Sequence, residues 1–214
     1  EEPVDDLASL RLGVRVDREG VLARDYHTAG GSHRKGETYG VITVDGSTRP
    51  VVSTRYYLAD ADFLVGLEGP LDLLEQVAQA LRQPRLPLYL GRKAFVPAVP
   101  VWIPDGLIPG AALEEALRRY PWPHEFMTTP AGRPPVEQQS HLRAVIECSP
   151  DEADRSQMDQ PVGAAFAHRT FRLRHTRTVL WQVGTDVPLR GGSVLDSYPV
   201  HPESEEPFRA AGPG

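Results

Sequence analysis

Cysteine is almost absent from this sequence, because Cys148 is the only one among 214 residues. A single thiol closes no disulfide within the chain and builds no cysteine-rich zinc site, which argues against an oxidising extracellular environment. Long apolar runs are also missing, since none approaches the roughly 18 residues of a membrane-spanning helix. The acidic first ten residues lack the basic flank and apolar centre of a signal peptide. We therefore expect a cytoplasmic protein, and the initial Glu1 leads us to expect an incomplete translation product.

Lysine is scarce as well: two lysines accompany 21 arginines, and the net charge is −6. This balance argues against a protein that coats nucleic acid over its whole surface. The basic residues are nevertheless grouped. Residues 82–93 hold four cations and no acid, and residues 168–177 hold four arginines, two histidines and no acid. Each group is either an ordinary solvated face or a local phosphate-binding surface.

The patterns that are present include both strand and helix signals. Apolar–polar alternation, or β-branched and aromatic composition, predicts strands over residues 10–16, 40–44, 50–58, 61–67, 141–148 and 169–173. Asp45-Gly46 predicts a hairpin turn between the second and third of these. Apolar residues at helical spacing predict helices over 70–83, with Pro70 at the first helical position, and over 111–119. This mixture predicts an α+β protein with a largely antiparallel sheet.

Residues 25–28 (Asp25-Tyr26-His27-Thr28) follow the first predicted strand and hold an acid and a histidine two positions apart. On an extended segment such a pair shares one face, so a carboxylate–imidazole contact is possible. The other interpretation is a polar base of a hairpin. A metal site is disfavoured, because His27 and His33 lack zinc-ligand spacing. We expect no metal and no cofactor.

Residues 29–39 combine three glycines with Arg34 and Lys35. Glycine lets backbone N–H groups approach an anion, and the adjacent cations supply charge. The spacing of a Walker loop is missing, so this is not a nucleotide-binding P-loop. The structural alternative is a hairpin tip.

Two further segments place cations beside a tyrosine or a glycine. Arg55 and Tyr56 end a strand, where an aromatic ring stacks on single-stranded bases and an arginine holds phosphates. Arg92 and Lys93 directly follow Gly91, which suits a turn that presents both cations to a phosphate chain. A common Arg–Tyr pair and a basic turn after a helix are the structural alternatives.

Four motifs between residues 13 and 100, read in order, resemble one protein family. They are GVRVDREG, DYHTAGG, STRYYLADADFLVGLEG and PRLPLYLGRKAFVPAVP. Together they are similar to the CasD subunits of type I-E CRISPR Cascade, which belong to the fifth Cas protein family of repeat-associated RNA-binding proteins. Beyond residue 100 the likeness is limited to the overall size and the strand near 169–174.

The resemblance implies a ferredoxin-like (RNA-recognition-motif) domain with an antiparallel sheet, a long β-hairpin thumb and a smaller β-rich C-terminal region. The expected boundaries are 1–105 for the ferredoxin-like domain, with the thumb at about 29–53, and 106–214 for the C-terminal region. The end of that region is rich in proline and glycine and is expected to be a flexible tail. The strand and helix with which the family normally opens are missing before GVRVD, so we expect an incomplete sheet.

The resemblance also implies a function. Members of this subtype bind the 5′ handle of the guide CRISPR RNA and cap the RNA–protein backbone for antiviral DNA interference. The implied partners are the guide RNA, the backbone subunit and the large subunit, with target DNA reached through the assembled complex and no membrane involved. The implied RNA-binding residues are Tyr26, His27, Thr28, Arg34, Lys35, Arg55, Tyr56, Gly91, Arg92 and Lys93.

Type I-E members are not nucleases, so the resemblance predicts a protein that is not an enzyme and in which His27 is not catalytic. One alternative is a metal-independent endoribonuclease of the same superfamily that cleaves CRISPR repeat RNA. It would use His27 together with Tyr26 or Lys93 for acid–base catalysis. Another alternative is a structural interaction module that never touches RNA.

Overall fold

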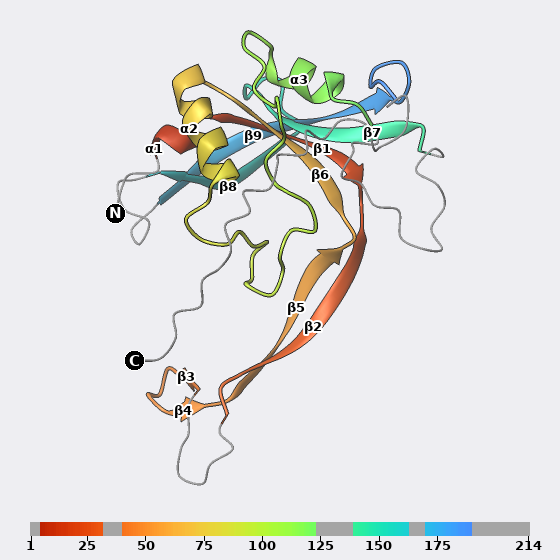
Figure 1. Ribbon diagram of the computed structural model, residues 1–214. Coiled ribbons are helices and arrows are strands. Elements are labelled where there is room, and N and C mark those ends of the chain that lie inside the picture. The colour runs from red at the N-terminus through yellow and green to blue at the C-terminus, as the bar shows by residue number, and fades with distance from the viewer. Residues whose placement is uncertain (1–4, 32–39, 123–138, 163–169, 190–214) are drawn as a thin grey trace, which may run out of the picture.

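The computed structural model describes residues 5–31, 40–122, 139–162 and 170–189, and its centre is a five-stranded antiparallel sheet (Figure 1). In the order β6-β1-β7-β9-β8, its strands are Asp62–Glu68, Arg11–Arg18, His141–Glu147, Thr170–Gln182 and Arg155–Val162. The first two strands come from residues 1–105 and the other three from 106–214, yet all five share one sheet. The predicted α+β class with a dominant antiparallel sheet is confirmed.

A two-stranded ribbon leaves this sheet and extends well away from it (Figure 1). Its strands, β2 (Val21–Ala29) and β5 (Val51–Ala59), are paired antiparallel along their full length. The hairpin turn predicted at Asp45-Gly46 lies toward the far end, between the short strands β3 (Val41–Ile42) and β4 (Thr48–Arg49). The long partner of residues 50–58 is therefore β2 and not residues 40–44, which the sequence pattern had suggested.

The turn at the ribbon tip is held by the Asp45 side chain. The backbone N–H of Ser47 donates to Asp45 Oδ1 at 3.0 Å, and the Ser47 hydroxyl donates to the same oxygen at 2.8 Å. Gly46 has a φ of 79°, a conformation that glycine adopts without steric cost. These local contacts explain why a short motif predicts the turn correctly.

Helix α3 (Leu113–Arg119) covers one face of the sheet. It packs closely because Gly13 on β1 lies directly opposite Gly66 on β6. A Cβ atom added at Gly13 would lie 2.7 Å from Leu117 Cδ1, and one at Gly66 would lie 2.9 Å from Leu113 Cδ1. The glycine pair therefore forms the floor on which the two buried leucines of α3 rest.

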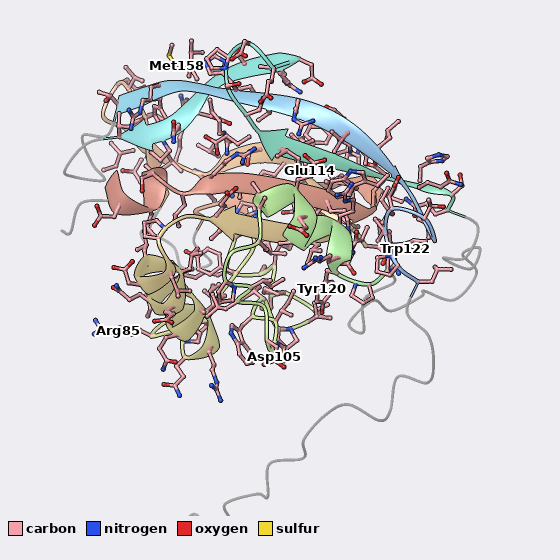
Figure 2. The ribbon with its side chains drawn as sticks, turned by 90° about the horizontal axis from the view of Figure 1, so that it is seen from above. Arg85, Asp105, Glu114, Tyr120, Trp122 and Met158 are labelled. Carbon is pink, nitrogen blue, oxygen red and sulfur yellow. The ribbon has the colours of Figure 1, made fainter. Side chains whose placement is uncertain are left out.

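The hydrophobic core lies between α3 and the strands β6, β7 and β9. Its buried members are Leu64, Leu113, Leu117, Trp122, Leu142, Ala144, Ile146, Trp181 and Val187. Tyr120 and Trp122 follow the C-terminal end of α3, and Glu114 at its start lies over the sheet (Figure 2). There Glu114 accepts a hydrogen bond from Arg177 Nη2 on β9 at 2.5 Å. Long-range contacts thus join both halves of the chain in one core.

The helix predicted over residues 70–83 is confirmed as α2 (Leu71–Arg82). Pro70 is its N-cap residue and not, as predicted, its first helical residue. None of its residues is buried, although its apolar positions are spaced as in a core helix. A short helix α1 (Asp5–Ala8) precedes β1. In the part of the chain that is described, no helix is long and apolar enough to cross a membrane.

Two differences from the predicted elements concern the C-terminal strands. The strand predicted over 169–173 continues to Gln182, because it pairs with β7 on one side and with β8 on the other. Strand β8 itself has mostly polar residues, and half of them are exposed, so no apolar alternation predicted it. Its pairing with β9 is what makes it a strand.

Candidate nucleic-acid interface

The two faces of the β2–β5 ribbon carry different side chains, because successive residues of a strand point to opposite sides. One face presents Tyr26, Tyr56 and Arg24, with Arg24 directly opposite Tyr56 in the register. The tyrosines are 75% and 65% exposed, respectively, so their rings are free of the core. We call residues 24–27 of β2, together with residues 53–57 of β5, the ribbon base. Exposed rings beside a guanidinium match the chemistry that binds single-stranded bases and phosphates.

The opposite face of the ribbon carries Asp25, His27, Arg55 and Tyr57. Asp25 is paired across the ribbon with Arg55, and His27 with Ser53. His27 Nδ1 lies 3.8 Å from Asp25 Oδ2, so the predicted carboxylate–imidazole contact is present. Tyr26 lies between the two in sequence and therefore points away from both.

The loop that holds Gly91, Arg92 and Lys93 docks onto this second face. Arg92 Nη1 donates to Asp25 Oδ2 at 2.5 Å, across 67 residues of sequence. Further along the loop, the ring of Phe95 packs against Tyr57 with a centroid distance of 4.7 Å. The sequence analysis treated the Asp25–His27 pair and the loop with Arg92 as separate features. The structure brings them together, because both His27 and Arg92 contact Asp25.

Within the loop, the backbone closes on itself. Leu90 N–H donates to the Phe95 carbonyl at 2.7 Å, and Phe95 N–H donates to the Arg92 carbonyl at 2.8 Å. Gly91 has a φ of 80°, which a residue with a side chain adopts only with strain. Lys93 is exposed at this turn. The loop therefore presents one solvated ammonium group from a defined backbone.

The structure places the remaining predicted RNA-binding residues as follows. Thr28 is exposed near the outer end of β2, and Arg55 Nε donates to Ser53 Oγ at 3.3 Å. Arg34 and Lys35 lie outside the described residues. Sequence reasoning missed Arg24, whose position two residues before Tyr26 on an extended segment is the signal that would have found it.

The second basic stretch of the sequence, residues 168–177, is partly neutralised by acidic side chains of the same fold. Arg174 Nη2 lies 2.5 Å from Asp159, and Arg177 reaches Glu114 over α3. His175 shares a hydrogen bond with Ser156 at 2.8 Å. Among the described residues of this stretch, ion pairs within the fold thus account for two of the cations, which favours the interpretation of a structural face.

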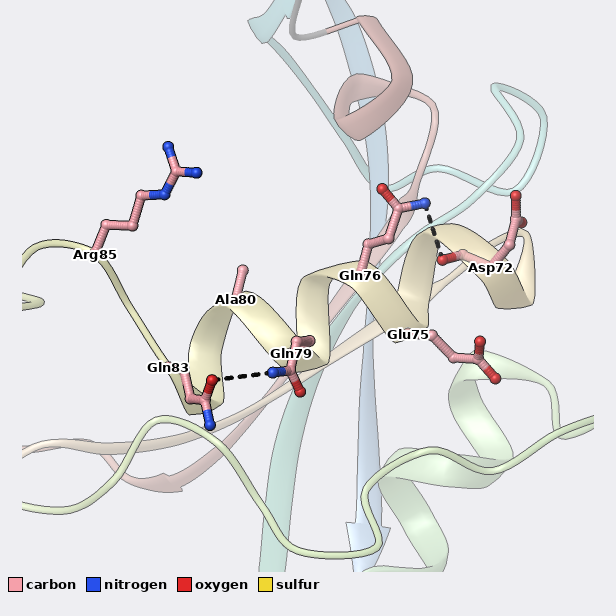
Figure 3. A pocket seen from close by; sticks show the side chains of 7 residues that line it. All are labelled: Asp72, Glu75, Gln76, Gln79, Ala80, Gln83 and Arg85. Atoms are coloured by element: carbon pink, nitrogen blue, oxygen red, sulfur yellow. Dashed lines mark hydrogen bonds between the residues drawn. The ribbon is translucent and has the colours of Figure 1, made fainter.

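Two hollows of the described structure lie away from the ribbon base. One, of about 700 Å³, follows the polar side of α2, where Gln76 donates to the Asp72 carbonyl and Gln79 to Gln83, while Arg85 lies beyond the helix end (Figure 3). The other, of about 600 Å³, is an apolar groove between β6, the apolar side of α2 and residues 101–116. Within the described residues no group of three His, Cys, Asp or Glu side chains could hold a metal ion.

The fold and this site define a class of protein. It is an α+β domain with an antiparallel sheet, from which a two-stranded ribbon extends that carries exposed tyrosines and arginines where it leaves the domain. A family profile described as CRISPR-associated protein (Cas_Cas5), of the Cas5d group, matches residues 1–177. The chain therefore belongs to the Cas5 family of CRISPR-associated proteins. The resemblance to the fifth Cas protein family is thereby confirmed at the level of the family.

Two solved structures are similar to this chain. The crystal structure of a Cas protein has 39% sequence identity and a TM-score of 0.61, over 88% of this chain and 75% of that one. A chain of a CRISPR RNA-guided surveillance complex has 31% identity and a TM-score of 0.62, over 87% of this chain and 73% of that one. No curated protein matches the sequence.

The prediction that the protein is not an enzyme is wrong. It rested on the likeness to one subtype, whereas the matching profile is that of Cas5d, a group known for endoribonuclease processing of precursor CRISPR RNA. The physical reason for the error is that RNA cleavage needs little visible machinery. The 2′-hydroxyl of RNA is itself the nucleophile, so a positioned base and acid suffice without a metal or cofactor.

Proposed function

We propose that this protein binds the repeat-derived 5′ handle of a guide CRISPR RNA, in the cytoplasm, as a subunit of an RNA-guided surveillance complex. The observation that carries the proposal is the base of the ribbon. There the exposed Tyr26 and Tyr56 flank Arg24 on one face, and the Gly91–Lys93 loop is docked on the other. The single-stranded handle would stack its bases on the rings and place phosphates near Arg24 on the same face, while Arg55 and Lys93 would meet phosphates on the opposite face.

The proposal extends to the place of the protein in the complex. The similarity to a chain of a surveillance complex supports a Cascade-type subunit. The four motifs within residues 13–100 favour the CasD place in type I-E Cascade, next to the backbone subunit and the large subunit. Because the ribbon projects beyond the sheet, it is the element that reaches a neighbouring subunit, and target DNA is met through the assembled complex.

A salt titration of handle binding tests the RNA contact. Lys93→Ala should flatten the dependence of log K on log salt by about 0.7, the value for one lost phosphate contact on a single strand. Tyr56→Ala should weaken binding by about 1–3 kcal/mol, while Tyr56→Phe, which keeps the ring, should bind like the wild type. Arg85→Ala is the matched control, because Arg85 shares the acid-free stretch but lies just beyond the end of α2, away from the ribbon. An unchanged slope for Lys93→Ala would contradict the proposal.

A second function, cleavage of the repeat RNA, is favoured by the Asp25–His27 contact and by the Cas5d profile. In this reaction His27 accepts the 2′-hydroxyl proton, the 2′-oxygen attacks phosphorus, and the leaving 5′-oxygen takes a proton from an acid. Lys93 is the better candidate for that acid than Tyr26. Its loop docks on the face that holds His27, whereas Tyr26 points to the other face.

A single-turnover assay with excess protein in chelator tests the cleavage. We expect the wild type to cut labelled repeat RNA to a 2′,3′-cyclic phosphate and a 5′-hydroxyl end. His27→Ala should abolish cutting while keeping handle affinity within about tenfold of the wild type. Intact repeat RNA with the wild-type protein after several hours would exclude the second function and leave the first standing.

A further inference from the structure

Arg92 is more engaged than a phosphate-binding arginine at a surface would be. Its side chain is only 21% exposed, and it forms an ion pair with Asp25 on β2. Its guanidinium carbon also lies 4.5 Å from the centroid of the Phe95 ring, within reach of a cation–π contact. That ring packs in turn against Tyr57 on β5. One loop thus holds both strands of the ribbon through a single cluster of four side chains.

The charges of this cluster limit what Arg92 can do for RNA. Asp25 cancels the charge of Arg92, so the pair offers no net attraction to a phosphate. Moving Arg92 onto a phosphate would break the ion pair and leave the Asp25 carboxylate beside the RNA backbone, where like charges repel. The neighbouring Lys93 forms no such pair in the described structure and is exposed. The two adjacent cations therefore have different roles.

We propose that Arg92 is a positioning residue that fastens the Leu90–Phe95 loop to the ribbon, so that Lys93 alone of the two cations meets the RNA. This inference rests on the proposed RNA-binding function and gives the two cations different roles. The Arg92–Asp25 ion pair, which we call the fastener, holds the loop in place, and Lys93 contacts the RNA. Asp25 takes part in both the Arg92 ion pair and the His27 contact. The same fastener therefore sets the distance between the loop and His27.

The test removes the ion pair without changing the net charge. The double variant Asp25→Asn with Arg92→Gln keeps the pair neutral, so the salt slope of handle binding should equal that of the wild type. Affinity should fall about tenfold, because the loop must then be ordered on binding. If Arg92 were a phosphate contact, the slope would fall by about 0.7, as it should for Lys93→Ala. That outcome would overturn the proposal.

A charge exchange supplies the second arm. Asp25→Arg with Arg92→Asp restores an ion pair of opposite direction, and we expect it to recover most of the affinity that either single variant loses. A phosphate-binding Arg92 would instead give no recovery, because the exchange places a carboxylate at the phosphate. Arg85→Ala is the control for loss of an arginine from the same stretch and should match the wild type in both affinity and slope.

Amide hydrogen exchange on the free protein keeps the test independent of RNA. In the neutral double variant, the Leu90 and Phe95 amides should exchange at least tenfold faster, while the β7 amides stay unchanged. Unchanged exchange at Leu90 and Phe95 would refute the fastener even if the protein bound no RNA. Faster exchange in a protein that binds no handle RNA would keep the fastener and refute the proposed function.

Discussion

A buried ion pair within β1 provides the sharpest stability prediction. Arg15 and Asp17 are both 0% exposed, and they are joined by two hydrogen bonds, of 2.6 Å from Nε and 2.9 Å from Nη2. Arg15 Nη1 also donates to the carbonyls of Leu117 and Tyr120, each at 2.6 Å. The indole N–H of Trp122 donates to the Asp17 carbonyl at 3.3 Å. This network ties the C-terminal end of α3 to the sheet.

The variant Asp17→Asn removes one charge at nearly constant volume and leaves Arg15 buried without a counter-ion. Breaking a buried pair in this way costs about 3–5 kcal/mol. The two carbonyls at the end of α3 keep their donor, so the helix itself is not uncapped and the cost reports the lost charge. With a urea m-value of about 2 kcal/mol/M, the midpoint of unfolding should fall by about 2 M.

Urea unfolding followed by tryptophan fluorescence and by far-UV circular dichroism measures this change. Glu115→Gln is the matched control on the same helix. Its ion pair with Arg119 is exposed, at 41% for Glu115 and 67% for Arg119, so its loss should cost no more than about 0.5 kcal/mol. A free energy of unfolding for Asp17→Asn within 1 kcal/mol of the wild type, in the same transition, would refute the reasoning.

Three further outcomes are expected. Gly13→Ala should lower the free energy of unfolding by about 1–3 kcal/mol in the same urea assay, because its Cβ would meet Leu117 at 2.7 Å. The pKa of Asp45 is lowered to about 2, chiefly by the hydrogen bond from Thr43. The stabilisation of the turn by the ionised Asp45 should therefore be complete above the unfolded pKa near 3.8 and lost as the pH falls through about 2, as an NMR titration would show. Desolvation raises the pKa of the Cys148 thiol, so at pH 7.5 it should react with a disulfide reagent more slowly in the folded protein than in urea.

Sequence reasoning worked where the signal and the structure span the same few residues. The helical spacing of α2 and the turn at Asp45-Gly46 each reflect contacts between near neighbours in the chain. The alternation around Val14 also predicts a strand correctly, although Val14 itself pairs with the distant Val65 and Val145. It also found the four motifs that indicate the Cas5 family. Its error about enzymatic activity arose because the prediction rested on the likeness to one subtype, and because a contact such as that of Asp25 with His27 has no sequence pattern that separates it from an ordinary polar strand.

The sequence by itself determined helix α2, the turn at Asp45-Gly46, the antiparallel α+β class and the residue types at the ribbon base. Only the tertiary structure decided that β2 and β8 are strands, that β5 pairs with β2, and that Arg92 reaches Asp25. The physical reason is the separation along the chain over which each kind of interaction acts. Helical spacing, alternation and turn chemistry act over a few residues, whereas the Arg92–Asp25 contact spans 67. Such a contact forms only when strand register and loop docking repay the entropy of closing the intervening chain.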